Sequence, residues 1–173
     1  MLRTLHVLFL ALCLLRSVAV ATDDCDSKDT PDAWEAITLP GNGEYWLQSS
    51  TQANPSDCLR GVVPTNPTKP DATIILKYKD QNGEWVETEW EFHTEGDKIS
   101  ATLGEKTLNG TVIFDTKGKC HIDQSPDDAY SLWKHSSASD NETDSCQKKF
   151  DEKTNGKTIM KPQEKDCPTE KVV

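Results

Sequence analysis

The chain has 173 residues, 28% of them charged, and a formal net charge of −10 at neutral pH. An acidic surface of this kind repels nucleic acids and anionic membranes, which argues against DNA binding, RNA binding or a role at a membrane surface. The sequence also contains five tryptophans. Disordered acidic chains have few aromatic residues, so we expect a folded protein.

The first 21 residues differ from the rest of the chain. They contain Arg3, an apolar run over 7–15, and the small residues Ala19-Val20-Ala21. This order is typical of a secretory signal peptide cleaved near Ala21, and the apolar run is too short to span a bilayer. We therefore expect a secreted, extracellular protein. Its mature chain, 22–173, has 152 residues and a net charge of −12, because two arginines leave with the signal peptide.

In chain order, the mature sequence predicts a short helix, eight strands and a second helix. Thr30 and Pro31 mark the start of the first helix, which covers 33–37 and stops at Gly41-Asn42-Gly43. Turn residues then separate short strands, and Asn82-Gly83 is a strong β-hairpin signal. Eight strands at this spacing indicate a barrel or a sandwich. The predicted strands are 44–50, 57–63, 72–79, 84–93, 97–103, 107–115, 119–124 and 129–135.

The pattern changes after Asn141. Residues 144–154 are highly charged and carry Cys146, Lys149 and Phe150 at helical spacing, and Asn155-Gly156 ends this second predicted helix. The polar tail that follows contains no further element.

Alternation along the strands assigns their apolar and aromatic side chains to one inward face. Asn109 and Asn141 lie in N-glycosylation sequons, and a glycosylated asparagine must point to solvent. In strand 107–115 this puts Val112 and Phe114 inside. Eight strands enclose a space that can hold one small ligand. The predicted ligand-lining residues are Ile74, Leu76, Tyr78, Val86, Trp90, Phe92, Ile99, Leu103, Val112, Phe114 and Leu132.

Signals for catalysis or metal binding are weak. The sequence has no HExxH, GxSxG, Walker loop or CxxC motif. Asp24-Cys25-Asp26 resembles the start of a calcium loop, but Lys28 falls on a ligand position and Asp29 on the glycine position. We expect no catalytic site, no metal and no cofactor.

The cysteines indicate disulfide bonds, as expected for a secreted protein. A bridge between the seventh predicted strand and the second helix would fasten that helix to the sheet, and a bridge from the second strand could hold the tail. The spacing alone leaves every pairing open, and one cysteine must stay free or link two chains. The cysteines of the mature chain are Cys25, Cys58, Cys120, Cys146 and Cys167.

A series of segments in both halves of the mature chain follows a recognisable order and spacing. They are Asp32-Ala33-Trp34, Tyr45-Trp46-Leu47, Cys58-Leu59-Arg60-Gly61-Val62, Cys120-His121-Ile122, Ala129-Tyr130-Ser131-Leu132-Trp133, Cys146, Lys149-Phe150, Gly156-Lys157-Thr158 and Cys167. Together they resemble the salivary lipocalins of ticks, the histamine-binding-protein family.

This resemblance covers most of the mature chain. It implies an all-β fold in which residues 22–173 form a single lipocalin domain. The domain would be an eight-stranded antiparallel barrel with a C-terminal α-helix packed outside. The resemblance also implies the bridges Cys58–Cys167 and Cys120–Cys146, which would leave Cys25 unpaired.

Departures from the family's amine-binding signature shape the functional hypothesis. That signature has one acid after the first cysteine of the C-terminal motif and another before its Leu-Trp pair, where this chain has His121 and Ser131. A buried amine needs carboxylates to offset its desolvation. Asp123 and Asp127 are interpreted as rim or loop groups. We therefore expect a small hydrophobic ligand, such as cholesterol, a fatty acid or an eicosanoid.

The resemblance extends to the japanin-like immunomodulatory group, which implies modulation of host immune or inflammatory responses. Two alternatives stay open. One is a scavenger of biogenic amines such as histamine or serotonin, and the other is a lipocalin that uses its acidic surface to bind a host immune-cell protein. We expect a monomer that neither binds nucleic acid nor inserts into a membrane, although an exposed Cys25 would allow a disulfide-linked dimer.

Overall fold

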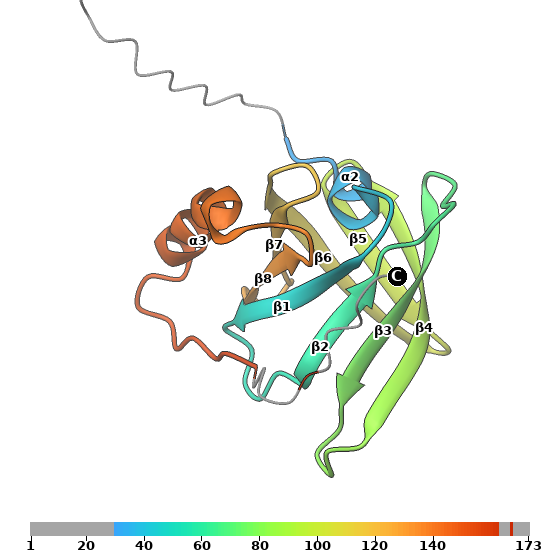
Figure 1. The fold of residues 1–173 in the computed structure, drawn as a ribbon, viewed down its shortest axis with the longest axis horizontal. Helices are drawn as coiled ribbons and strands as arrows, with labels where there is room; N and C mark the ends of the chain where they lie inside the picture. The colour runs from blue at the N-terminus through green and yellow to red at the C-terminus, as the bar shows by residue number, and fades with distance from the viewer. Residues whose placement is uncertain (1–29, 163–166, 168–173) are drawn as a thin grey trace, which may run out of the picture.

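The computed structural model describes residues 30–162 and Cys167. The predicted signal peptide and Cys25 lie outside the described residues. The described chain forms a closed barrel in which strands β1 to β8 follow one another in sequence order and β8 pairs back with β1, all antiparallel (Figure 1). The barrel expected from the family resemblance is therefore confirmed.

The strands lie within a few residues of their predicted positions. They are β1 (Glu44–Ser50), β2 (Asp57–Val62), β3 (Asp71–Lys79), β4 (Trp85–Glu95), β5 (Lys98–Leu103), β6 (Lys106–Asp115), β7 (Cys120–Gln124) and β8 (Tyr130–His135). Two helices accompany them, α2 (Ala33–Thr38) and α3 (Asp140–Lys153). Neither described helix is long and apolar enough to cross a membrane.

The predicted hairpin joins β3 to β4. Gly83 has a φ of 80°, which favours glycine, and the Asp80 carboxylate accepts backbone hydrogen bonds from Asn82 at 2.8 Å and Glu84 at 2.9 Å. The hairpin pairs Ile74 with Trp90 across the two strands. Turn chemistry thus fixes the register that the alternating pattern requires.

Helix α3 packs against the outside of the barrel over β7 and β8 (Figure 1). Its Cys146 and Phe150 are fully buried against Ile122 of β7 and Leu132 of β8. The Cys120–Cys146 disulfide fastens the helix to β7.

Helix α2 closes one end of the barrel. Its Ala33 and Ala36 are fully buried against Val112 of β6, and Ile99 packs on the same cluster. The Ala33 amide donates a hydrogen bond to the Gly96 carbonyl at 2.8 Å, which ties the helix to the β4–β5 turn. The opposite end of the barrel, at the β3–β4 and β5–β6 hairpins, is therefore the end at which a ligand could enter.

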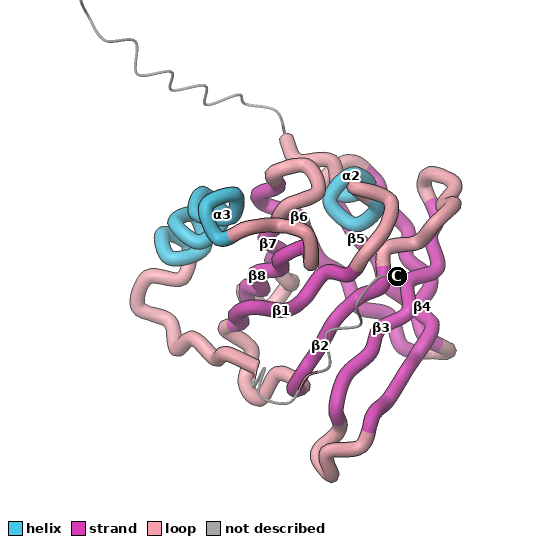
Figure 2. The backbone as a smooth tube through the Cα atoms, viewed as in Figure 1, coloured by secondary structure: helices cyan, strands magenta, loops and turns pink. Residues whose placement is uncertain are grey.

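The loop after α3 returns to the barrel (Figure 2). Met160 and Ser50 exchange two backbone hydrogen bonds, of 2.7 and 2.9 Å, beside the end of β1. Farther along the chain, Cys167 forms a disulfide with Cys58. Both bridges implied by the resemblance are present.

The starts of both helices differ from the prediction. Asp32, not Thr30, caps α2, because its carboxylate accepts a hydrogen bond from the Trp34 amide at 2.8 Å. Helix α3 starts at Asp140, four residues earlier than predicted. There the Ser139 amide donates to the Glu142 carboxylate at 2.8 Å. The Ser-x-x-Glu pattern is a capping-box signal that the sequence prediction missed.

Two residues predicted to face the lumen lie on the outer side. Leu132 is buried under α3, and Phe114 packs on the same cluster. The pairing of β6 with β7 shifts between Val112 and Phe114, so that Val112 lies opposite Asp123 and Phe114 opposite Ile122. Such a bulge reverses the alternation of faces, and Phe114 therefore turns outward although Val112 faces inward.

Candidate functional site

The inward faces of β3 and β4 form an apolar wall of the lumen. The pairing places Ile74 opposite Trp90, and Tyr78 opposite Val86. Trp90 is only 7% exposed, and its indole N–H donates to the Thr88 hydroxyl at 3.0 Å, which satisfies its single donor inside the wall.

The wall continues across the neighbouring strands. Phe92 lies opposite Ala101 of β5, and Leu76 lies opposite Gly61 of β2. A Cβ atom added to Gly61 would lie 3.3 Å from Leu76 Cδ2, so this glycine allows the two strands to pack closely on the lumen side.

The remaining predicted lining residues occupy two different places. Ile99 and Val112 face inward but pack against α2 at the closed end, where Val112 is fully buried. Leu103 is 37% exposed at the β5–β6 hairpin, which belongs to the open end. The apolar residues that lie between the two ends are Ile74, Leu76, Tyr78, Val86, Trp90 and Phe92.

The opposite wall, formed by β7 and β8, is polar. Because Cys120 and Ile122 point outward to α3, alternation turns His121 and Asp123 toward the lumen. The Trp133 indole N–H donates to Asp123 Oδ2 at 2.7 Å. The interpretation of Asp123 as a rim or loop group was wrong. The disulfide to the outer helix turns Cys120 outward, and alternation along β7 then turns Asp123 inward.

The Asp123–His121 pair leaves two buried polar atoms without hydrogen bonds. His121 Nε2 lies 3.5 Å from Asp123 Oδ1, too far for a good hydrogen bond. Among the described residues, His121 Nδ1 and Asp123 Oδ1 have no hydrogen-bond partner. A buried polar atom without a partner costs about 1–3 kcal/mol, so this pair destabilises the ligand-free polar wall.

Burial makes the neutral forms of both side chains more favourable. It raises the pKa of Asp123 to about 7, although the hydrogen bond from Trp133 acts in the opposite direction. It lowers the pKa of His121 to about 3. The imidazole is thus neutral at physiological pH, whereas the carboxyl group is close to half ionised.

Below this pair, toward the closed end, the polar residues are held by the protein itself. Tyr45 lies edge-on to His121 and to His135, with ring centroids 4.7 and 5.1 Å away, and its hydroxyl donates to the Leu39 carbonyl. The two ring nitrogens of His135 lie 2.8 Å from the Ser137 hydroxyl and 2.7 Å from the Asn42 carbonyl. Burial also raises the pKa of Asp115, opposite His121, to about 6.

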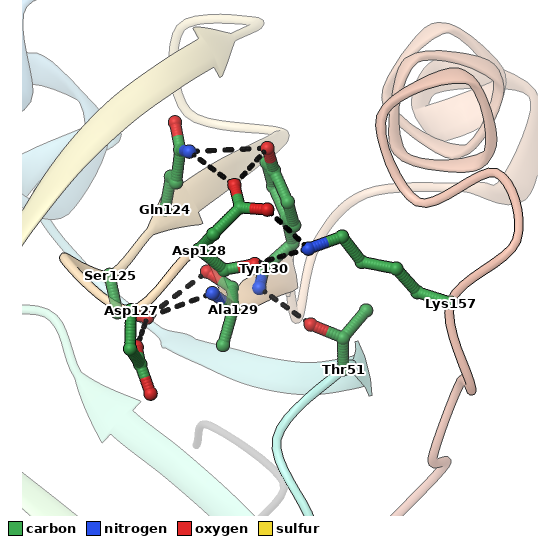
Figure 3. Close-up of polar contacts among 8 residues, drawn as sticks. All are labelled: Thr51, Gln124, Ser125, Asp127, Asp128, Ala129, Tyr130 and Lys157. Atoms are coloured by element: carbon green, nitrogen blue, oxygen red, sulfur yellow. Dashed lines mark hydrogen bonds and ion pairs between the residues drawn. The ribbon is translucent and has the colours of Figure 1, made fainter.

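A hydrogen-bonded cluster holds the β7–β8 turn next to the polar wall (Figure 3). Asp128 accepts from Gln124 at 2.7 Å and from the Tyr130 hydroxyl at 2.8 Å, and it forms an ion pair with Lys157 from the loop after α3. These donors, Lys157 first, lower the pKa of Asp128 to about 2. Asp127, in the same turn, is exposed, as predicted. The cluster fixes the strands that carry Asp123 and Trp133.

Sequence reasoning therefore missed the polar half of the lumen. The missing signal was available: a disulfide from Cys120 to the outer helix forces Cys120 outward, and alternation then places His121 and Asp123 inside. Within the described residues, no group of three or more His, Cys, Asp or Glu side chains is arranged to hold a metal ion. The lumen thus has an apolar wall on one side and buried polar groups on the other.

Comparison with known proteins identifies the family to which the chain belongs. Moubatin, a lipocalin of the tick Ornithodoros moubata, is 36% identical over 156 residues, which cover 88% of this chain and 90% of moubatin. The chain belongs to the tick lipocalin family. No model of a protein family matches it.

Solved structures agree with this assignment. The tick lipocalin AM182, whose crystal structure is a complex with serotonin, is 29% identical and matches with a TM-score of 0.69 over 80% of this chain and 93% of its own. Lobster apocrustacyanin A1 matches with a TM-score of 0.54 at 12% identity, over 78% of this chain and 87% of its own, and shows the fold alone. Moubatin and AM182 are lipocalins, which are ligand-binding proteins.

Proposed function

We propose that this tick lipocalin is a secreted carrier of a small hydrophobic ligand with one hydrogen-bonding group near Asp123. The observation that carries the proposal is the contrast between the two walls of the lumen. The wall around Trp90 and Phe92 offers apolar contact. The wall around His121 and Asp123 offers buried polar atoms without partners.

The apolar wall would supply most of the affinity. Burying an aromatic or aliphatic group stabilises a complex by about 1.5–3 kcal/mol per side chain covered, and a ligand against this wall covers several. The polar wall would contribute less to the affinity but more to the selectivity among ligands. A ligand hydroxyl near Asp123 Oδ1 or His121 Nδ1 removes the cost of an unpaired buried atom, which an entirely apolar ligand leaves in place.

The protonation of the pair favours a hydroxyl over a permanently charged group. His121 is neutral and Asp123 is close to half protonated at neutral pH, so together they can donate and accept hydrogen bonds. Cholesterol, hydroxylated fatty acids and eicosanoids all combine a hydroxyl with a large apolar surface. At the open end, the Lys106 ammonium lies 5.7 Å from the centroid of the Trp90 ring, which favours a carboxylic acid over a sterol.

A biogenic amine is the second candidate, and it rests on a different observation. AM182, at 29% identity, was crystallised with serotonin. In its ionised form Asp123 could pair with an ammonium group, and the indole of Trp133 lies beside it. Among the described residues, however, Asp123 is the carboxylate that contacts Trp133, and Asp115, opposite His121, lies nearer the closed end. The two acids of the amine-binding signature are replaced by His121 and Ser131.

We further propose that binding of the ligand removes a lipid mediator from the host and so modulates immune or inflammatory responses. The family assignment and the predicted signal peptide support this role. The alternative, direct binding of a host immune-cell protein by the acidic surface, does not need the lumen. It therefore predicts a protein that acts equally well with and without ligand.

Ligand extraction tests the proposal most simply. The full chain is secreted from insect cells, purified without detergent, and analysed by native mass spectrometry and by solvent extraction. The proposal predicts a bound hydroxylated lipid, or uptake of one by the delipidated protein with a Kd below about a micromolar. Failure to bind sterols, fatty acids and eicosanoids, together with tight binding of serotonin or histamine, would replace it with the amine function.

A further inference from the structure

A groove of about 560 Å³ lies outside the lumen, on the outer surface of β4, β5 and β6. Its walls combine apolar surface, from Ile99 and Pro126 among others, with polar side chains. The polar lining residues include His93, Lys98, Ser100, Asn109, Thr111 and Gln124. This volume falls within the range of roughly 300–1,000 Å³ typical of small-molecule sites. The groove differs from the apolar wall of the lumen because hydroxyl, amide and charged groups lie beside its apolar surface.

Asn109 lines this groove and is also the first residue of the sequon Asn109-Gly110-Thr111. It is exposed and lies directly opposite Ser100 in the β5–β6 pairing. Neither side chain has a hydrogen-bond partner among the described residues, whereas the Thr111 hydroxyl accepts a bond from the Lys98 ammonium at 3.0 Å. The groove thus presents unpaired amide and hydroxyl groups around the point of glycan attachment.

We propose that Asn109 carries an N-linked glycan whose first sugars lie in this groove. The donor is a lipid-diphosphate-linked oligosaccharide. The Asn109 amide nitrogen forms a bond to the anomeric carbon and loses one proton, while the bond from that carbon to the diphosphate breaks and the lipid diphosphate leaves. Attachment holds the sugars beside the groove at high effective concentration, so weak hydrogen bonds suffice to order them.

The second sequon has a different setting. Asn141 is exposed in the first turn of α3, and it is not among the residues that line the groove. The Thr143 hydroxyl of that sequon donates to the Asp140 carbonyl at 2.9 Å within the helix. A glycan on Asn141 would therefore extend into solvent and serves as an internal comparison.

A matched control can be built into the β3–β4 hairpin. Glu84→Thr gives the exposed turn at Asn82-Gly83 the same sequon tripeptide as residues 109–111. The groove can be blocked separately by Ser100→Arg, which leaves the Asn109 sequon intact and lies on the outer face, away from the proposed ligand. Secretion from insect cells supplies the glycan donor for all variants.

The experiment measures glycan occupancy by peptide mapping and the rate of release by peptide N-glycosidase from the folded protein. The proposal predicts that Asn109 is occupied and that its glycan is released at least three-fold more slowly than those at Asn141 or Asn82. In the Ser100→Arg variant and in denatured protein this difference should disappear. An unmodified Asn109 in secreted protein, or release at Asn109 less than three-fold slower than at both control sites, would overturn the proposal.

Discussion

The two walls of the barrel have opposite polarity inside and outside. The strands β3 and β4 place Ile74, Trp90 and Phe92 toward the lumen and Glu87, Glu89 and similar residues in water. The strands β7 and β8 do the reverse. Asp123 and Trp133 face the lumen, and the apolar Ile122 and Leu132 lie outward under α3.

The difference shows where each wall obtains its stability. The apolar wall buries its own hydrophobic surface inside the barrel and needs no cover. The polar wall contains unpaired buried groups that cost free energy, and it is stabilised from outside by Phe150, by the Cys120–Cys146 bridge and by the Asp128–Lys157 cluster. We infer that the outer helix allows the lumen to hold polar groups.

Removing the external support should have the largest effect on stability. Replacing Cys120 and Cys146 together by alanine should lower the free energy of unfolding by up to about 3.5 kcal/mol, because the bridge closes a loop with a sequence separation of 26. Urea denaturation of this double-alanine variant and of the parent protein measures the difference in free energy of unfolding. A loss below about 1 kcal/mol would show that α3 supports the polar wall without the bridge.

The apolar wall can be tested with Trp90→Ala. This change removes a large contact surface and should weaken binding of a hydrophobic ligand by about 2–3 kcal/mol, roughly thirty- to a hundred-and-fifty-fold in Kd. Glu89→Gln, which changes the neighbouring residue on the outer face, is the matched control and should leave Kd unchanged. Fluorescence titration of both variants, after confirming that each is folded, makes the comparison. Equal Kd values would show that the ligand does not contact this wall.

The cost of the polar wall should appear in the pH dependence of stability. Burial raises the pKa of Asp123 from 3.8 to about 7, so the folded state takes up a proton between these values and stability falls as the pH rises through this window. Asp123→Asn removes the titrating group but keeps an acceptor for Trp133. At pH 8, the variant should be more stable than the parent by about 1–2 kcal/mol.

At pH 4, the parent and this variant should have nearly the same stability, because the parent carboxyl is then protonated in the folded state. Thermal unfolding of the ligand-free proteins at both pH values provides the measurement. Asp115, whose pKa is raised to about 6, leaves a weaker dependence of the same sign in both proteins. A variant that is less stable at pH 8 would mean that the Asp123 charge is compensated.

The smallest effect is expected at the β7–β8 turn. The hydrogen bonds and ion pair with Lys157 hold the pKa of Asp128 at about 2, so this carboxylate stabilises the fold above its ordinary pKa and loses that effect as the pH falls toward 2. Lys157→Met should therefore lower stability slightly at pH 7 and less at pH 2, where the ion pair is lost but the hydrogen bond from Lys157 to the Asp128 carbonyl remains. Thermal unfolding at the two pH values measures the difference. An equal loss of stability at both pH values would show that the effect of Lys157 does not depend on the charge of Asp128.

Local patterns predicted the barrel well. Turn residues such as Asn82-Gly83 and the alternation in β3 and β4 are short-range signals, and they placed these strands and the apolar wall. The inward faces of β7 and β8 could not be read from hydrophobicity, because α3 covers their outer side and reverses the usual pattern. The outward turn of Phe114 depends on a bulge, which no local signal in β6 marks.

The central claim is that Asp123 binds a polar group of a hydrophobic ligand, and a thermodynamic cycle tests it directly. The parent and Asp123→Leu are each titrated with a long-chain fatty acid and with its monohydroxylated derivative. We predict that the hydroxyl strengthens binding to the parent by about five- to tenfold, the contribution of one hydrogen bond, and that this gain disappears in Asp123→Leu. An equal gain in both proteins, or none in either, would contradict the account.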